Sequence, residues 1–428
     1  MATAGSPRHP ESLSDERMQP NGEVVETDSW RLVVPPHVTG DSPILCIPTV
    51  HPRGDRRVIR CAQVALDAGF RLSFVWLGEG EPGRHPAIEE RLLPTPASTK
   101  ERLLSVRTVA RVARDIDARL WHIHDFYMLG QARRWHRKTG RPVVYDVHEY
   151  YGEYYASKLP LPGWARRFVG EQLDRYQART TRATRGGANL VAEAMRSPFD
   201  RLNVPVAVSP NYPSAEQFRE GLRLPFAERS MRLIHTGSLN REYGSQALVR
   251  IAKRALDRDA GLQIDVMARF SSQQDREDFM RMVEEAGNPP NLRILDPVPT
   301  HEMPELLASY GFGLSLLQPS HPQVDTAVAS KLYEYAVMGL VIASTDGRAA
   351  AQFISNHALG FTVGPDELDL LVTKITELRR DEASTEAALD RSVAHARARF
   401  TWEGTSSPAL RALYARVVSG GSAAVSRG

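Results

Sequence analysis

Residues 330–344 carry the side chains whose types and spacing best suit ligand-binding chemistry. Ser330 is expected to cap a helix that begins at Lys331 and ends just before a buried strand. Unpaired backbone N–H groups at a helix amino terminus bind phosphate oxygens, and Lys331 adds a positive charge there. Glu334 lies one turn in, but the capping-box position belongs to Tyr333. We therefore expect Glu334 to grip a pair of ribose hydroxyls; the alternative is a surface acid favoured by the helix dipole.

Several other patterns resemble cofactor or metal motifs. The glycine run at residues 78–83 follows a predicted strand, but its two carboxylates and the proline after it argue against dinucleotide binding. The D-x-D patterns at 115–117 and 257–259 fall where helices end before strands, away from the ligand-binding edge of an open sheet. His122 and His124 share one face of a strand and would suit zinc, but a strand end that leads into a cleft is the better explanation. We expect no metal site.

The composition excludes several classes of protein. A total of 54 Lys and Arg against 51 Asp and Glu gives a formal charge of +3, which is too weak for a dedicated nucleic-acid binder. The hydrophobic fraction of 42% excludes wholesale disorder. Two cysteines cannot staple a chain of 428 residues, so a reducing cytoplasm is expected. No apolar run approaches the roughly eighteen residues of a membrane span, and residues 1–41 lack the apolar core of a signal peptide.

Strand and helix patterns alternate through residues 42–418. In the first half, strands are expected at 44–48, 72–77, 119–124, 142–147, 188–191 and 205–208, with helices between them. In the second half, strands are expected at 231–235, 262–268, 292–295, 312–317, 340–343 and 361–363. Such alternation predicts parallel sheets joined by right-handed crossovers, and therefore two doubly wound α/β domains with a ligand cleft between them.

The same patterns predict the boundaries of the domains. We expect a disordered arm over 1–41, a first Rossmann-like domain over 42–212, a linker over 213–230, a second Rossmann-like domain over 231–400, a helix over 401–418 that could pack back on the first domain, and a disordered tail over 419–428.

These segments, taken in order, resemble the retaining, nucleotide-sugar-dependent glycosyltransferases of the GT-B fold, specifically family 4. The resemblance covers about residues 42–418 and is carried by Leu-Ile-His-Thr-Gly-Ser-Leu at 233–239, Asn-Leu-Arg-Ile-Leu-Asp-Pro-Val at 291–298, the helix and strand of 330–344, Tyr-Asp-Val-His-Glu at 145–149 and Pro-Asn-Tyr-Pro at 210–213. It implies a GT-B architecture, with two Rossmann-like domains that face an interdomain cleft.

The resemblance also implies an activity. An enzyme of this kind moves a sugar from a UDP- or GDP-sugar to a hydroxyl of a glycan, a lipid-linked saccharide or a small molecule. Front-face departure and attack would retain the configuration, with no metal and no cofactor besides the nucleotide-sugar donor. Helix amides and cations would stabilise the departing diphosphate. By resemblance, the donor contacts are Gly237, Ser238, Arg241, Arg269, Val298, Ser330, Lys331, Leu332 and Glu334.

The donor side departs from the family pattern at three positions. The family's Arg and Lys, which together neutralise the diphosphate, correspond here to Ser238 and Tyr243. We expect Arg241 and Arg269, with Lys331, to take their place. The first of the family's two glutamates corresponds to Thr326.

The acceptor side is assigned to the first domain. His148 follows the strand at 142–147 and matches the family histidine near the reacting carbon, although it could instead hydrogen-bond to the backbone. The other expected acceptor contacts are Arg53, Asp55, His124, Glu149 and Glu153.

Two further questions stay open in the sequence. The basic stretches at 133–141 and 166–185 could contact anionic lipid at the inner face of a membrane, or could be solvated faces. The same fold also serves nucleotide-sugar 2-epimerases, and Ser238 and Tyr243 would suit a non-catalytic partner subunit.

Overall fold

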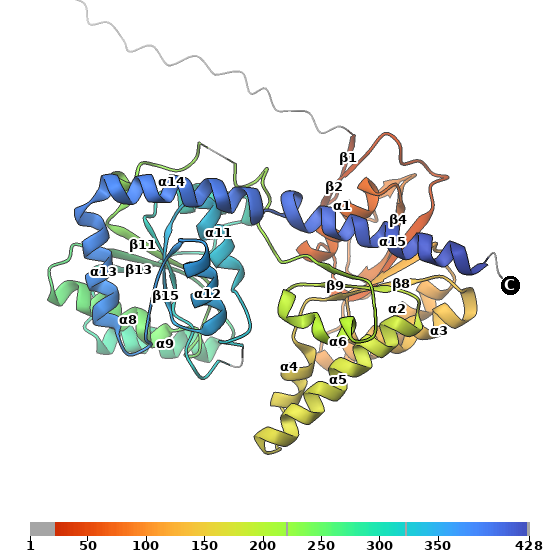
Figure 1. Ribbon diagram of the computed structural model, residues 1–428, viewed down its shortest axis with the longest axis horizontal. Helices are drawn as coiled ribbons and strands as arrows, with labels where there is room; N and C mark the ends of the chain where they lie inside the picture. The colour runs from red at the N-terminus through yellow and green to blue at the C-terminus, as the bar shows by residue number, and fades with distance from the viewer. Residues whose placement is uncertain (1–21, 220, 322, 426–428) are drawn as a thin grey trace, which may run out of the picture.

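The computed structural model describes residues 22–219, 221–321 and 323–425, and these form two α/β domains that lie side by side (Figure 1). Each domain is built on a mainly parallel sheet with helices on both faces. The predicted fold class, two doubly wound parallel-sheet domains, is therefore confirmed.

The first domain holds an eight-stranded sheet in the order β10-β9-β8-β7-β3-β4-β6-β5. All described pairs are parallel except β5 with β6. The strands are β3 (Ile44–Pro52), β4 (Arg71–Leu77), β5 (Arg84–His85), β6 (Ile88–Leu93), β7 (Leu120–Ile123), β8 (Val143–Val147), β9 (Gly187–Leu190) and β10 (Val206–Val208). The glycine run at 78–83 leads into this strand pair and not into a helix, as its proline indicated.

The helices of the first domain connect these strands. They are α1 (Arg56–Asp67), α2 (Thr99–Arg114), α3 (Leu129–Thr139), α4 (Tyr151–Ser157), α5 (Gly163–Ala183) and α6 (Ser197–Asp200). Asp55 caps α1 by accepting hydrogen bonds from the backbone N–H groups of Arg57 and Val58. This cap holds the amino terminus of α1 at the carboxyl end of β3.

The expected disordered arm is wrong for residues 22–41. β1 (Glu23–Glu26) and β2 (Arg31–Val34) form an antiparallel hairpin. Trp30 and Leu32 are buried in the core of the first domain, and the Trp30 indole N–H donates to Glu90 over 2.9 Å. The polar composition of the segment concealed these contacts, because its partners lie on distant strands. Residues 1–21 of the predicted arm lie outside the described residues.

The second domain holds a six-stranded parallel sheet in the order β13-β12-β11-β14-β15-β16. Its strands are β11 (Arg232–Leu239), β12 (Gln263–Phe270), β13 (Leu292–Ile294), β14 (Phe312–Ser315), β15 (Val341–Thr345) and β16 (Gly360–Val363). Its helices are α7 (Phe226–Arg229), α8 (Ser245–Asp257), α9 (Gln273–Glu285), α10 (Met303–Ala308), α11 (Ser330–Met338), α12 (Arg348–Asn356), α13 (Leu368–Arg380) and α14 (Glu382–Arg399).

The segment expected to be a linker packs largely against the second domain. Phe218 and Phe226 are buried in the cores of the second domain, so most of residues 213–230 packs there. The last helix, α15 (Ser407–Val425), returns to the first domain, where Leu413 and Tyr414 join the core beside α1 (Figure 1). This helix extends through most of the predicted disordered tail and reaches Val425; residues 426–428 lie outside the described range.

Candidate active site between the two domains

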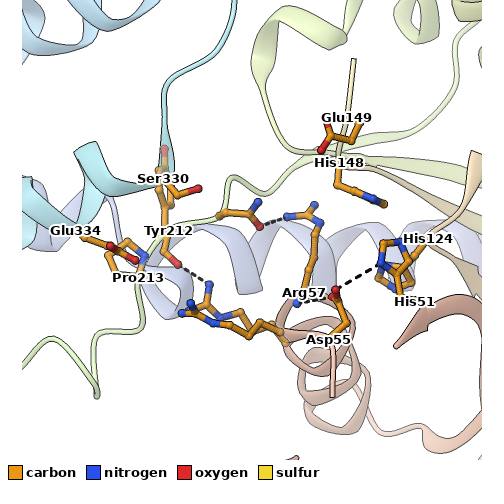
Figure 2. Close-up of a pocket in the computed structure, with 13 residues that line it drawn as sticks. His51, Asp55, Arg57, His124, His148, Glu149, Tyr212, Pro213, Ser330 and Glu334 are labelled. Atoms are coloured by element: carbon orange, nitrogen blue, oxygen red, sulfur yellow. Dashed lines mark hydrogen bonds and ion pairs between the residues drawn. The ribbon is translucent and has the colours of Figure 1, made fainter. Parts of the chain in front are cut away.

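Side chains from both domains line one pocket of about 350 Å³. In Figure 2, Ser330 and Glu334 of α11 lie on one side of the pocket, and His148, His51 and Asp55 of the first domain lie on the other. The first-domain residues follow the carboxyl ends of β3 and β8, the edge at which ligands of open parallel sheets bind. A second hollow of about 700 Å³ adjoins it, since His148 and Ser330 line both.

The amino terminus of α11 opens into this pocket. The helix begins at Ser330 with Ala329 at the N-cap position, and no side chain caps it. The prediction that Ser330 is the cap is wrong by one position, because the hydroxyl does not accept a bond from the first turn. No side-chain oxygen therefore competes with an incoming anion for the first N–H groups.

Lys331 and Glu334 are both half-buried, and burial shifts the pKa of each towards its neutral form. The Lys331 ammonium lies 3.4 Å from His235 Nδ1, and burial lowers the pKa of Lys331 to about 7. Burial also raises the pKa of Glu334, against the opposing influence of Arg56, Arg60 and Lys331. Desolvation thus disfavours the charged form of both groups, and a polar ligand would restore favourable contacts for them.

The floor of the pocket on the first-domain side is a buried charge network around Asp146. The Arg57 guanidinium donates to both carboxylate oxygens, each over 2.7 Å. His124 Nδ1 lies 2.9 Å from Asp146, and the Asn189 amide donates to it over 3.1 Å. Arg57 also donates to the Asn211 side chain over 2.8 Å, so the network ties β8 and α1 to the segment between the domains.

His148 is a neutral imidazole that faces the pocket. Its Nε2 lies 3.2 Å from the Tyr151 hydroxyl, and its Nδ1 is a buried atom with no hydrogen-bond partner among the described residues. Burial lowers its pKa to about 4. At neutral pH it can therefore offer a lone pair or an N–H to a ligand, but not a positive charge.

His51 is a pocket residue that the sequence reasoning missed. It lies near the end of β3, its ring centroid is 5.0 Å from that of His148, and its nitrogens lie within 3.5 Å of Asp55 and Asp125. Burial alone would raise the pKa of Asp55, but hydrogen bonds from His51 and from the Val58 N–H hold it below its usual range. The signal was present, because His51 lies at the carboxyl end of a strand, as His148 does.

Some of the expected donor residues lie together on the neighbouring strands β11 and β12, and others lie elsewhere. Gly237 has a left-handed φ of 91° with open space where a Cβ would lie, and Ser238 is paired in register with Arg269 on β12. Val298 lies half-buried in the loop after β13. Leu332 is fully buried, and its backbone N–H donates to the Ala329 carbonyl over 2.9 Å.

Arg241 lies apart from the expected donor residues on β11 and β12. It lines a separate hollow with the acidic residues Asp275 and Asp278. The residues that line the Glu334 pocket include none of the three expected cations, Arg241, Arg269 and Lys331. Arg56 and Arg60 of α1 are among them.

Only some of the expected acceptor residues line the pocket. Asp55, His124 and Glu149 line the pocket. Arg53 does not, because its guanidinium turns away to bind Glu90 and Asp28. Its expected place at the cleft is therefore wrong. Glu153 is exposed in the first turn of α4 and lines neither hollow.

The histidines weighed as zinc ligands lie in the buried network. Cys61, His122, His124 and Asp146 each offer one ligand atom, all within 4.8 Å of one another. His122 Nδ1 lies 2.7 Å from the Tyr414 hydroxyl, and both Asp146 oxygens already accept hydrogen bonds from Arg57. His122 Nδ1 and the Asp146 carboxylate therefore already have hydrogen-bond partners within the protein.

Direct contacts join the domains beside the pocket. The Tyr150 hydroxyl donates to the Thr326 carbonyl over 2.8 Å, and the rings of Tyr212 and Tyr333 meet edge to face with centroids 4.7 Å apart. Thr326, where the family pattern has an acid, thus contacts the first domain through its backbone.

Comparison of the whole structure with solved structures gives several full-length matches. HepE from Anabaena, solved in complex with UDP-glucose, matches with a TM-score of 0.61 and 14% identity, over 87% of this chain and 100% of HepE. Sucrose-phosphate synthase from Thermosynechococcus elongatus matches with a TM-score of 0.64 and 14% identity, over 88% and 99% of the two chains.

A UDP-forming α,α-trehalose-phosphate synthase from Burkholderia vietnamiensis matches with a TM-score of 0.60 and 14% identity, over 88% and 99% of the chains. No protein-family model and no curated protein sequence matches this chain. At such low identity the likeness establishes architecture alone: two Rossmann-like domains arranged as in the GT-B glycosyltransferases.

Proposed function

We propose that this protein is a retaining glycosyltransferase that moves a sugar from a UDP- or GDP-sugar to an acceptor hydroxyl. The carrying observation is that Ser330 and Glu334, at the open amino terminus of α11, line one pocket with His148 and Glu149 of the other domain. The complex of the similar HepE with UDP-glucose supports the choice of a nucleotide-sugar donor.

The donor diphosphate would lie against the first turn of α11. The first N–H groups of α11 would face its oxygens, Lys331 on the same turn would add positive charge, and Glu334 would hold the ribose hydroxyls. Arg56 and Arg60, which line the same pocket from α1, supply further positive charge. These groups would stabilise the leaving diphosphate without requiring a metal ion.

The transfer would proceed on one face of the sugar. The bond between the anomeric carbon and the phosphate oxygen breaks, the acceptor oxygen bonds to the same face, and its proton passes to the departing phosphate oxygen. His148 would orient the acceptor hydroxyl through a neutral hydrogen bond, because its pKa of about 4 leaves it uncharged at neutral pH.

The acceptor would be a saccharide or a small molecule with a hydroxyl that reaches His148. The Asp146 network would keep the acceptor-side wall rigid, so that His148 and Glu149 hold their positions. A cytoplasmic site of action fits the two cysteines, Cys46 and Cys61, which are buried thiols.

Titration calorimetry with UDP and GDP, followed by assays with their sugars, tests this function. We expect one nucleotide to bind and stabilise the protein, by about 2.7 kcal/mol at a hundredfold excess over Kd. We also expect the diphosphate to be released faster when a saccharide acceptor is present. A protein that binds neither nucleotide would instead be a partner subunit. A donor converted to an isomer without any acceptor would indicate a 2-epimerase.

A further inference from the structure

The turn of the α4–α5 hairpin exposes a group of large apolar side chains. Leu159 and Leu161 are each 39% exposed, Trp164 is 70% exposed and Phe168 is 58% exposed. Figure 1 shows that this hairpin extends away from the rest of the first domain, with the turn at its far end. We call residues 158–168 the hairpin tip.

The apolar face is confined to the tip. Trp164 and Phe168 are four residues apart and so share one face of α5. Further along that face, Gln172 and Arg175 are polar. The shape therefore suits shallow insertion of one end, and it does not suit a helix that lies flat along an apolar groove.

The stem of the hairpin is tightly packed, which makes the tip a rigid projection. α4 and α5 approach so closely at Gly152 that a Cβ there would lie 2.6 Å from the Gly170 carbonyl oxygen and 2.5 Å from Asp174. Only glycine allows this approach. The exposed side chains are thus presented by a fixed support.

The charge of the tip is entirely positive. Lys158, Arg166 and Arg167 are exposed, and residues 157–170 contain no acid. The Lys158 ammonium lies 3.8 Å from the centroid of the Tyr154 ring, at the edge of the apolar group. Cations that surround exposed aromatic and leucine side chains match the chemistry of an anionic lipid surface.

We propose that the hairpin tip docks this protein on the surface of a bilayer that contains anionic lipids. Trp164, Phe168 and the two leucines enter the headgroup region, and the three cations bind the lipid phosphates. The contact is peripheral: no described helix has the length and apolar content of a membrane span. A second copy of the chain is a poorer occupant, because two positively charged tips would repel each other.

The position of the tip relates to the pocket. α4 begins two residues after Glu149 and spans roughly 10 Å at about 1.5 Å per residue, so it joins the acceptor side to the tip directly. The docking nevertheless rests on the hairpin alone and does not depend on the proposed transfer.

Flotation of the full-length protein with vesicles tests the proposal. We expect binding to vesicles that contain phosphatidylglycerol and little binding to vesicles of phosphatidylcholine alone. The double variant Trp164→Ser/Phe168→Ser should bind the anionic vesicles at least tenfold more weakly, whereas Met280→Ser, at a 46% exposed apolar residue of the second domain, should bind normally. Because both tip residues are exposed, the double variant should fold, and circular dichroism checks this.

Charge reversal provides a second, independent test. Each cation contributes roughly fivefold to lipid partitioning, so Arg166→Glu/Arg167→Glu should weaken binding by about 25-fold or more. The proposal is overturned if the native protein does not bind anionic vesicles, or if either double variant binds as well as the native protein. A native dimer that the Trp164→Ser/Phe168→Ser change dissociates would also overturn it, in favour of a second copy. Nucleotide titration in solution reports on the pocket separately.

Discussion

The two walls of the interdomain pocket manage buried charge in opposite ways. On the first-domain wall, Asp146 accepts hydrogen bonds from Arg57, His124 and Asn189, so its charge is fully compensated within the protein. On the second-domain side, Glu334 lines the pocket and Lys331 lies one turn earlier on the same helix, and burial disfavours the ordinary charged form of each. The charges of the first wall are already compensated in the free protein, whereas a bound ligand would supply the missing polar contacts on the second.

The two kinds of wall correspond to a scaffold and to a binding site. A satisfied buried network stabilises a single geometry, whereas desolvated groups in a pocket mark a place where a ligand changes the energetics. Mutations on the first wall should therefore act chiefly on stability, and mutations on the second wall chiefly on donor binding.

The largest expected effect is on the first wall. Asp146→Ala leaves the Arg57 guanidinium buried without its partner and should lower the free energy of unfolding by about 3–5 kcal/mol. Chemical denaturation measures this, with Asp115→Ala, at an exposed acid, as a control that should change stability by less than about 0.5 kcal/mol. If Asp146→Ala changed the free energy of unfolding as little as the control does, the first wall would not be a stabilising scaffold.

The pH dependence follows from the same network. Burial alone would raise the pKa of Asp146, but Arg57 and His124 hold it well below its usual value. A carboxylate with a depressed folded-state pKa contributes its full stability above the unfolded pKa of about 3.9. The contribution should be complete at neutral pH and should decline only as the pH falls below about 4.

Glu334→Gln should act on binding. Loss of a charged hydrogen bond to ribose should raise the donor KM by about 10- to 100-fold, with unchanged or slightly higher stability because a buried carboxylate is removed. Glu305→Gln, at an exposed glutamate of the same domain, is the matched control. Normal donor kinetics in the Glu334 variant would remove its assignment to ribose.

His148→Ala should affect turnover more than binding. Loss of one neutral hydrogen bond to the acceptor should lower kcat about tenfold and leave the donor KM nearly unchanged. Because the pKa of His148 is about 4, its titration should not alter kcat between pH 6 and 8. His136→Ala, whose ring contacts the Arg141 carbonyl, is the control, and equal loss in both variants would argue for a structural role.

The smallest effect concerns a proton. With a pKa of about 7, Lys331 is mostly neutral at pH 8, and a bound diphosphate should raise that pKa. Nucleotide binding should therefore take up close to one proton at pH 8 and almost none at pH 6. Calorimetry in buffers of different ionisation enthalpy measures the uptake, which Lys331→Met should abolish; native uptake that is the same at both pH values would refute it.

Local patterns in the sequence determined most of the elements. β4 and β16 lie within one residue of their predicted ranges, since apolar runs bounded by turn residues are local signals. The hairpin at residues 22–41 escaped prediction, because Trp30 gains its burial and its partner Glu90 only in the folded protein. β6 escaped for a similar reason: no strand was expected between residues 77 and 119, and β6 gains its pairing with β4 only in the folded protein.

Two α/β domains and a helix terminus within one residue of Ser330 could be predicted from local patterns, because strand alternation and helix boundaries depend on neighbouring residues. Which charges meet depends on the folded arrangement. It directed Arg53 to Glu90, gathered Arg57 and Asp146 into the floor, and set Arg60 beside Glu334. Side-chain directions depend on packing between segments far apart in the chain, and residue spacing does not record that packing.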